Sequence, residues 1–265
     1  MKIITWNVNS IRTRLERLLA LLERHQPDVV CLQETKVTDD IFPHAELEDA
    51  GYRSEVFGQK TYNGVALLSR HPLTDVERGF PENPVPEEAR VIAGTVPAGE
   101  LGPLRVLNLY VVNGKAVGTD KYERKLLWLD RLTEWICDRE MTGRPFLVLG
   151  DFNIAPDDRD VWDPERWRGK ILCSPPERER FAKLLDLGLA DLFREVSDEG
   201  GHFTWWDYRM GAFHRGWGLR IDLLLGSSHV AARPLTVETD REERKSSTGP
   251  GKPSDHAPVI VTLDV

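Results

Sequence analysis

The chain has 265 residues, and its 43 acidic side chains outnumber 35 basic ones to leave a net charge of −8. That length can bury a full core, so we expect residues 1–265 to form a single domain. The negative balance argues against a protein that binds nucleic acid through overall positive charge, although carboxylates gathered around a divalent cation would carry such a charge by design.

Neither a membrane span nor a secretory leader is indicated. No stretch approaches the ~18 to 20 consecutive apolar residues that cross a bilayer, and "MKIITWNVNS" enters a strand-like pattern at once. The cysteines Cys31, Cys137 and Cys173 are odd in number and widely spaced, without C-x-x-C, which predicts neither disulfides nor a zinc site. We therefore expect a cytoplasmic protein without membrane contacts, and a monomer.

Strand patterns recur along the chain, and several are continuous apolar runs, as expected for strands that are covered on both faces. In chain order, the predicted strands are 2–7, 28–33, 52–58, 64–69, 90–96, 104–111, 146–151, 202–206, 219–226 and 258–265.

Three helices are predicted between these strands. Residues 11–24 carry leucines on one face after Ser10 as N-cap, with Arg17 on the opposite, solvent face. Residues 120–139 show helical spacing of apolar side chains after Asp120 as cap, and 177–187 is a shorter candidate. About ten strands with three helices predict an α/β fold, a four-layer sandwich of two packed sheets with helices outside.

Two polar or proline-rich stretches are predicted to be surface loops within this domain. They are "PENPVP" at 81–86 and "TDREERKSSTGPGKPSD" at 239–255. Neither has the composition of an interdomain linker, and no internal repeat was found.

Polar side chains stand where several predicted strands begin or end. They are Asn7, Glu34, Asp151, Asn153, Asp222, Asp255 and His256. Taken one at a time, each of these residues can be explained by a structural role. A Gly-Asp-x-Asn run, for example, is common in turns. Asp222 is harder to dismiss, because an ionised carboxylate between Ile221 and Leu223 is costly to bury unless it has a partner.

Seven motifs follow one another along the chain: "TWNVNS", "LQETK", "NLYVVNG", "GDFNIAP", "TWWDYR", "GLRIDLLL" and "SDHAPV". In this order and spacing the chain resembles the exonuclease III family of abasic-site endonucleases, within the endonuclease/exonuclease/phosphatase superfamily, over essentially its full length. The resemblance implies the deoxyribonuclease I-like form of the sandwich, in which both sheets are mainly antiparallel.

The same resemblance implies a site for Mg²⁺ or Mn²⁺, cations that prefer oxygen ligands. Its implied ligands are Asn7, Glu34, Asp151, Asn153, Asp255 and His256. It further implies that His256 pairs with Asp222, and that Tyr110 and Asn153 face the scissile phosphate. Asp151 and His256 both remain candidates for the general base, and the sequence leaves open whether one or two metals act.

Substrate contacts are expected in residues 203–220, where aromatic side chains alternate with arginines. The resemblance places Trp205 in the pocket for the base-free sugar. Further candidates for substrate contact are Arg90 and Arg209, with Arg215, Arg220, Lys115, Lys121 and Arg124 as other basic side chains. Residues 161–180 match only a branch of the family, which leaves substrate preference open.

The resulting prediction is a divalent-metal-dependent DNA-repair nuclease that cuts duplex DNA 5′ to abasic sites and cleans or trims 3′ ends. Three alternatives would carry different sequence features: a superfamily phosphodiesterase for phosphoinositides, sphingomyelin or cyclic dinucleotides, a secreted deoxyribonuclease I-like enzyme, and a binding or scaffold protein that has lost catalysis. A lipid-cleaving enzyme would favour an apolar anchor, and a secreted enzyme would favour a leader and disulfides. A scaffold protein would have replaced some of the metal-ligand residues. The sequence shows none of these features.

Overall fold

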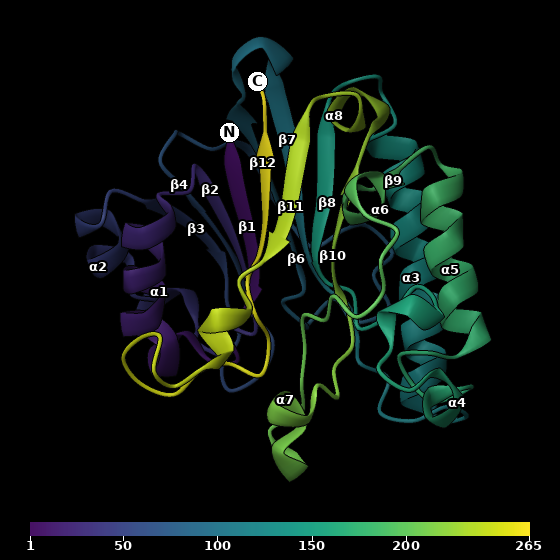
Figure 1. Cartoon of the computed structure of the whole chain (residues 1–265). Coiled ribbons are helices and arrows are strands. Elements are labelled where there is room, and N and C mark those ends of the chain that lie inside the picture. The colour runs from purple at the N-terminus through teal and green to yellow at the C-terminus, as the bar shows by residue number, and fades with distance from the viewer.

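The computed structural model describes all residues from 1 to 265, and its centre is formed by two six-stranded sheets packed face to face (Figure 1). The first sheet has the order β11 (Leu235–Thr239), β12 (Val259–Leu263), β1 (Lys2–Asn7), β2 (Val29–Gln33), β4 (Val65–Ser69) and β3 (Arg53–Phe57). The second has the order β5 (Thr74–Arg78), β6 (Val91–Pro97), β7 (Pro103–Tyr110), β8 (Phe146–Asp151), β10 (Asp222–Gly226) and β9 (Ala190–Asp191). Each sheet contains one parallel pair, β1 with β2 and β7 with β8, and is otherwise antiparallel.

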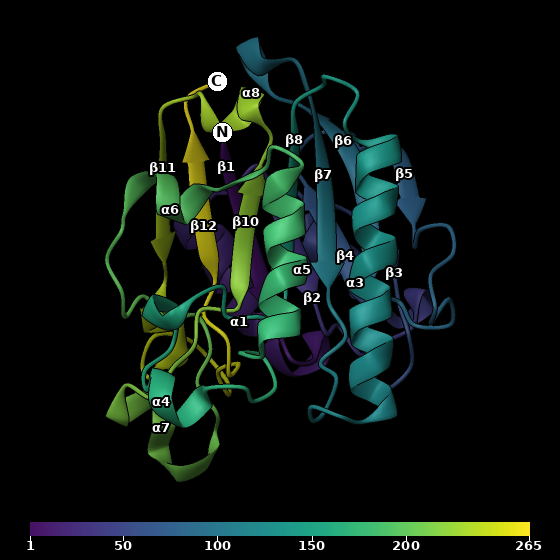
Figure 2. The same ribbon diagram turned by 90° about the vertical axis from the view of Figure 1, so that its right-hand side faces the viewer.

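Helices cover the outer faces of both sheets. Helices α1 (Ile11–His25) and α2 (His44–Asp49) lie against the first sheet, and α3 (Asp120–Arg139) and α5 (Pro175–Asp186) lie side by side on the second (Figures 1 and 2). Short helices are α4 (Pro164–Trp167), α6 (Leu192–Val196), α7 (Ala212–Arg215) and α8 (Ser228–Ala231), and 3₁₀ turns are η1 (Asp39–Ile41), η2 (Gly99–Leu101), η3 (Asp158–Asp160), η4 (Arg209–Gly211) and η5 (Arg241–Arg244). The predicted four-layer sandwich is confirmed. No helix is long and apolar enough to cross a membrane.

The continuous apolar runs are explained by three stacked core layers. In β8, Leu147 and Leu149 face the core between the sheets, while Phe146 and Val148 face the core beneath α3 and α5. A third core lies between the first sheet and α1. Strands buried on both faces cannot show a polar alternation, as the sequence pattern predicted.

The predicted strand at 202–206 is wrong. Only Trp205 in that stretch forms isolated bridges, to Leu219 and to His256. The apolar pattern there reflects packing of Trp206 into a small core with Phe213 and not membership of a sheet. The predicted strand at 219–226 begins later, at Asp222.

Three strands were not predicted: β5, β9 and β11. Two of them, β5 with the sequence "TDVER" and β11 with "LTVET", lie at sheet edges and contain no buried residue. Edge strands are often exposed and charged, because charged side chains help to block pairing with other chains. They therefore have few of the apolar residues from which a strand is predicted.

Helix ends and faces also differ from the prediction in detail. The cap of α3 is Thr119, whose side chain accepts a hydrogen bond from the Tyr122 amide, so Asp120 is the first helical residue. Ser10 precedes α1 but makes no capping hydrogen bond with its side chain. Helix α5 begins two residues before the predicted start, where Ser174 and Glu177 form a capping box.

Arg17 was expected to face solvent, and that expectation is wrong. Its side chain is buried and donates hydrogen bonds to the carboxylate of Glu243 and to the carbonyl oxygen of Gly249. The predicted surface loop 239–255 is therefore partly anchored, because Glu243 and Arg244 within it are buried against α1 and the 206–213 segment.

Candidate active site

The predicted polar residues converge at one end of both sheets, opposite the chain termini (Figure 1). Asn7 ends β1, and Glu34 directly follows β2, the parallel neighbour of β1. Asp151 ends β8 and lies opposite Asp222, the first residue of antiparallel β10. Neighbouring strand ends thus bring together side chains that are far apart in sequence, as fixed scaffolds commonly do.

Gly150 is required by close strand packing and not by a turn. It lies within β8 at φ 137°, and a Cβ there would stand 2.0 Å from the carbonyl oxygen of Leu109 on β7. Asp151 then leaves the strand with its Oδ1 accepting the amide hydrogen of Asn153 at 2.9 Å. Asn153 itself adopts φ 50°, which asparagine tolerates better than most residues.

His256 and Asp222 form the buried pair that the resemblance implied. His256 Nδ1 lies 2.9 Å from Asp222 Oδ2, and Thr204 Oγ1 donates to the same oxygen at 2.6 Å. Burial alone lowers the pKa of His256, but the charges of Asp222 and Asp151 outweigh burial and raise it to about 10. The imidazole is therefore held as imidazolium at neutral pH in the metal-free site.

Asn7 links two carboxylates across the site. Its Nδ2 donates to Glu34 Oε1 and to Asp151 Oδ2, both at 2.9 Å. Burial raises the pKa of Asp151 to about 7, although His256 opposes the shift. Burial also acts to raise the pKa of Glu34, but the ammonium of Lys36 and the Asn7 amide lower it overall. Two carboxylates in one buried site are costly unless positive charge is supplied.

Three of the six predicted metal ligands gather closely enough to share a cation. One ligand atom each from Glu34, Asp151 and His256 lies within 4.8 Å of the others. Two carboxylates at this spacing fit a hard divalent cation. His256 Nδ1 is engaged by Asp222, so only its Nε2, which lies 3.8 Å from Asp151, is free to join these carboxylates.

The other three predicted ligands lie nearby with their polar atoms already bonded. The Asn7 oxygen accepts from the amide of Asn9 and not from the site, and the Asn153 oxygen accepts from Asn113 at 2.9 Å. Asp255 accepts from Asn9 and from the indole of Trp205 at 3.1 Å. Their assignment as ligands stays a prediction.

Tyr110 faces the same carboxylates. Burial, and next the negative charge of Glu34, raise the pKa of Tyr110 well above its ordinary value, so the phenol stays a hydrogen-bond donor. The Arg90 guanidinium lies 4.7 Å from the centre of the Tyr110 ring and donates to the Tyr110 carbonyl at 3.1 Å. Arg90 is also buried and paired with Glu88. Its position therefore fits a role in holding Tyr110 in place better than it fits direct contact with the substrate.

The remaining basic candidates divide into exposed and buried ones. Arg209 is exposed and paired with Asp207, and Arg215 is exposed with its guanidinium 4.6 Å from the centre of the Trp217 ring. Lys115, Lys121 and Arg124 are exposed and form no ion pair. Arg220 does not face a substrate, because it is buried between Asp160 and Asp191, to which its nitrogens bond at 2.6 and 2.7 Å.

A buried lysine supports the site and was not predicted. Lys125 on α3 donates to the carbonyl of Asn153 at 2.7 Å and to the carboxylate of Glu177 on α5. Both charged side chains are completely buried. The sequence did carry a signal, since Lys125 falls on the apolar face that Tyr122, Leu129 and Ile136 define.

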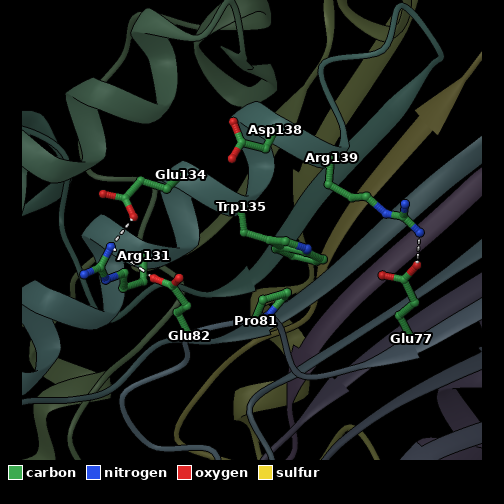
Figure 3. A pocket seen from close by; sticks show the side chains of 8 residues that line it. All are labelled: Glu77, Pro81, Glu82, Arg131, Glu134, Trp135, Asp138 and Arg139. Atoms are coloured by element: carbon green, nitrogen blue, oxygen red, sulfur yellow. Dashed lines mark hydrogen bonds and ion pairs between the residues drawn. The ribbon is translucent and has the colours of Figure 1, made fainter.

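A hollow of about 800 Å³ lies away from the candidate site, on the outer side of α3 (Figure 3). Its arginines point toward neighbouring glutamates, with Arg131 bonded to Glu134 at 2.7 Å and Arg139 to Glu77 at 2.8 Å. None of the predicted site residues contributes to it, so size alone does not mark the site in this protein.

Known proteins resemble the chain along its whole length. The pattern of the Endonuclease/Exonuclease/phosphatase family matches residues 4–256. The chain is 36% identical to the exodeoxyribonuclease III of Haemophilus influenzae, over 98% of both chains. Among solved structures, it is similar to the 3′ phosphatase NExo from Neisseria bound to product DNA hairpin, with TM-score 0.93 and 47% identity, and to an AP endonuclease from Archaeoglobus fulgidus, with TM-score 0.92 and 35% identity. Both structural matches cover 100% of each chain.

Proposed function

The chain belongs to the Endonuclease/Exonuclease/phosphatase family, and from this premise we propose that it is a DNA-repair nuclease that hydrolyses the phosphodiester 5′ to abasic sites and also acts from 3′ ends. It is a hydrolase of the exodeoxyribonuclease III type, since one relative of that name and another named exodeoxyribonuclease match it over nearly their full length. The single observation that carries the proposal is the buried His256–Asp222 pair, with His256 Nε2 3.8 Å from the carboxylate of Asp151.

Phosphodiester hydrolysis requires the types of group that this site holds. The anionic phosphate oxygens repel a nucleophile, so positive charge and hydrogen-bond donors must face them. The imidazolium of His256 and the phenol of Tyr110 supply these at neutral pH. Asp222 keeps the imidazole protonated and oriented, which is a positioning role.

Asp151 is our candidate for the group that takes the proton from the attacking water. Its pKa of about 7 in the metal-free site lies near neutral pH, where a general base works best. His256 remains the competing candidate, and its pairing with Asp222 keeps it protonated in the metal-free site. A bound cation would lower the pKa of Asp151, so its proximity to the metal decides how strong a base it is.

We propose that the resident cation is Mg²⁺, with Mn²⁺ as a substitute, held by Glu34 and Asp151 with Asn7 and Asp255 near them. When bound, such a cation supplies positive charge to the phosphate oxygens and acts as a Lewis acid. The family relation supports a divalent metal, and the choice of Mg²⁺ rests on the oxygen-rich donor set.

The proposed substrate is duplex DNA that carries an abasic site or a 3′ end, bound by one copy of the chain in the cytoplasm. Trp205 lies at the site through its bond to Asp255, which supports its role beside the base-free sugar. Arg209 stands at the exposed rim of the same segment, where it can reach a phosphate.

The deciding experiment uses an end-labelled duplex with one central abasic analogue, and an intact duplex with a recessed 3′ end, each with Mg²⁺ and with EDTA. We expect metal-dependent incision at the lesion together with 3′ trimming. Trimming without incision would restrict the function to 3′ ends. If neither duplex is cut while a generic phosphodiester is hydrolysed with metal, DNA is not the substrate.

A further inference from the structure

A second hollow, of about 350 Å³, lies beside the candidate site. It is formed between the 162–170 segment, which includes α4, and the 205–217 segment, which includes α7. Figure 2 shows both short helices below the sheets, and residues of both segments line the hollow. The proposed chemistry uses only Trp205 and Arg209 from its lining.

Aromatic rings form the walls of this hollow. The indoles of Trp162 and Trp217 stack on one another, with centroids 4.9 Å apart and planes 18° apart. The Arg166 guanidinium lies over both rings, at 5.5 and 5.9 Å from their centres. Trp167 and Trp205 add further apolar surface.

Packing within the protein covers these rings only in part, since Trp205 and Trp217 contact core clusters but stay partly exposed. Trp206, in the same segment, is only 1% exposed and belongs to a core cluster, whereas Trp162, Trp205 and Trp217 are partly exposed. Met210 on the rim is 68% exposed. Apolar surface that faces water is unfavourable, so a ligand that covered it would be stabilised.

Charge around the hollow suits an anionic ligand with a planar group. Arg166 and Lys170 line it, are exposed and form no ion pair. The only carboxylate in the lining is that of Asp207, and it is already paired with Arg209 at 2.7 Å. Aromatic walls together with cations that have no carboxylate partner are a combination by which proteins hold single nucleotides.

The hollow is continuous with the reaction site through Trp205. This indole lines the hollow and donates to Asp255, and its backbone forms a bridge with His256. A nucleotide in the hollow would therefore belong to the same DNA whose backbone lies at His256.

From these contacts we propose that the Trp162–Trp217 hollow holds one unpaired nucleobase of the bound DNA, in contact with the partly exposed indoles and with Arg166. The proposal rests on the proposed function, because it names how the same nuclease recognises an end or lesion. It predicts that the protein prefers duplexes in which one base at the reacting end is free to leave its stack.

The test compares two recessed duplexes that differ only in whether the 3′-terminal base is matched or mismatched. Phosphorothioate linkages at that end prevent their consumption in Mg²⁺, and fluorescence anisotropy gives each Kd. We expect the wild-type chain to bind the mismatched end about tenfold more tightly, the size of one base-stacking contact. Arg166→Gln and Trp162→Leu should remove most of this preference.

Arg168→Gln is the matched control, since Arg168 is an exposed arginine two residues away that lies outside the hollow. It should keep the tenfold preference. Equal wild-type binding to both ends, or a preference that survives Arg166→Gln, overturns the proposal. Trimming of the unmodified duplex and incision of the abasic duplex are measured alongside: if both are normal, only the nucleobase site fails, and if the wild type cuts neither duplex, the proposed function fails with it.

Discussion

The protonation of His256 is set by its carboxylate neighbours and not by its exposure to solvent. Burial by itself favours the neutral imidazole, yet Asp222 at 2.9 Å and Asp151 at 3.8 Å stabilise the charged form more strongly. Because the folded-state pKa lies above the value of about 6.5 for an unperturbed histidine, this pair stabilises the fold fully below that pH. The contribution is lost as the pH rises through about 10.

Asp222→Asn should lower the pKa of His256 toward its ordinary value, because the largest favourable charge is removed. The measurement is an NMR titration of the His256 ring in metal-free protein, where no cation contributes to the shift. In the wild type the ring should stay protonated through neutral pH and lose its proton only in the alkaline range. The same titration midpoint in both proteins would contradict the assigned pairing.

Asp151→Asn should cost at least ~10² in turnover, the lower end of general-base contributions. The fold should stay intact, because burial already disfavours the charged carboxylate, with a modest loss of stability because the amide nitrogen cannot accept one of the two hydrogen bonds from Asn7 and Asn153. Steady-state cleavage of the abasic duplex gives the rate, and thermal unfolding of the metal-free proteins serves as the control. A folded variant with near-normal turnover would remove Asp151 from the mechanism.

At the scale of elements, the Lys125–Glu177 pair joins α3 and α5 to the loop that follows β8. Lys125 bonds both Glu177 and the carbonyl of Asn153, and Glu177 caps α5 through Ser174. Burial lowers the pKa of Lys125, and the charge of Glu177 only partly opposes this. Breaking such a pair leaves an uncompensated buried charge.

Lys125→Met should therefore destabilise the protein by about 3 to 5 kcal/mol, as removal of one partner of a buried ion pair does. Denaturant unfolding measures the change. The double variant Lys125→Met, Glu177→Met should lose less than the sum of the two single variants, since no charge is left unpaired. Lys121→Met, an exposed position on the same helix, should change stability by less than about 0.5 kcal/mol.

Elements that are buried on one or both faces were predictable, because burial leaves a pattern in the sequence. The 120–139 helix and the strand at 146–151 have the predicted bounds. Edge strand β5 and the irregular stretch around Trp205 were not predictable, since exposed strands lack apolar alternation and isolated bridges depend on distant partners.

The positions of several polar side chains at strand ends were predictable from where they interrupt apolar runs, whereas the roles assigned to them come from the family resemblance and stay predictions. The expected partner of Asp222 proved to be His256, together with Thr204. The buried bonds of Arg220 and Arg17 could not be predicted, because their carboxylate partners come from segments distant in sequence. Local pattern shows that a charged side chain needs a partner, and only the packed fold shows which partner it finds.

At the scale of the whole molecule, a chain of net charge −8 must bind a polyanion through local positive charge. Unpaired, exposed cations stand near the site end, where the chain passes from β7 to α3: Lys115, Lys121 and Arg124. With Arg209 across the site, they form a small set of candidate phosphate contacts. Association driven by such contacts depends on salt, because bound cations leave the DNA.

Four phosphate contacts give a slope of about −3.6 in a plot of log binding constant against log salt, so affinity should fall roughly a hundredfold between 50 and 200 mM KCl. The measurement is anisotropy with the phosphorothioate duplex at fixed Mg²⁺. Lys121→Gln should weaken binding to every duplex and make the slope shallower by about 0.9, because one fewer counterion is released. A wild-type slope near zero would mean that these cations do not contact the phosphates, and that phosphate contacts do not hold the DNA.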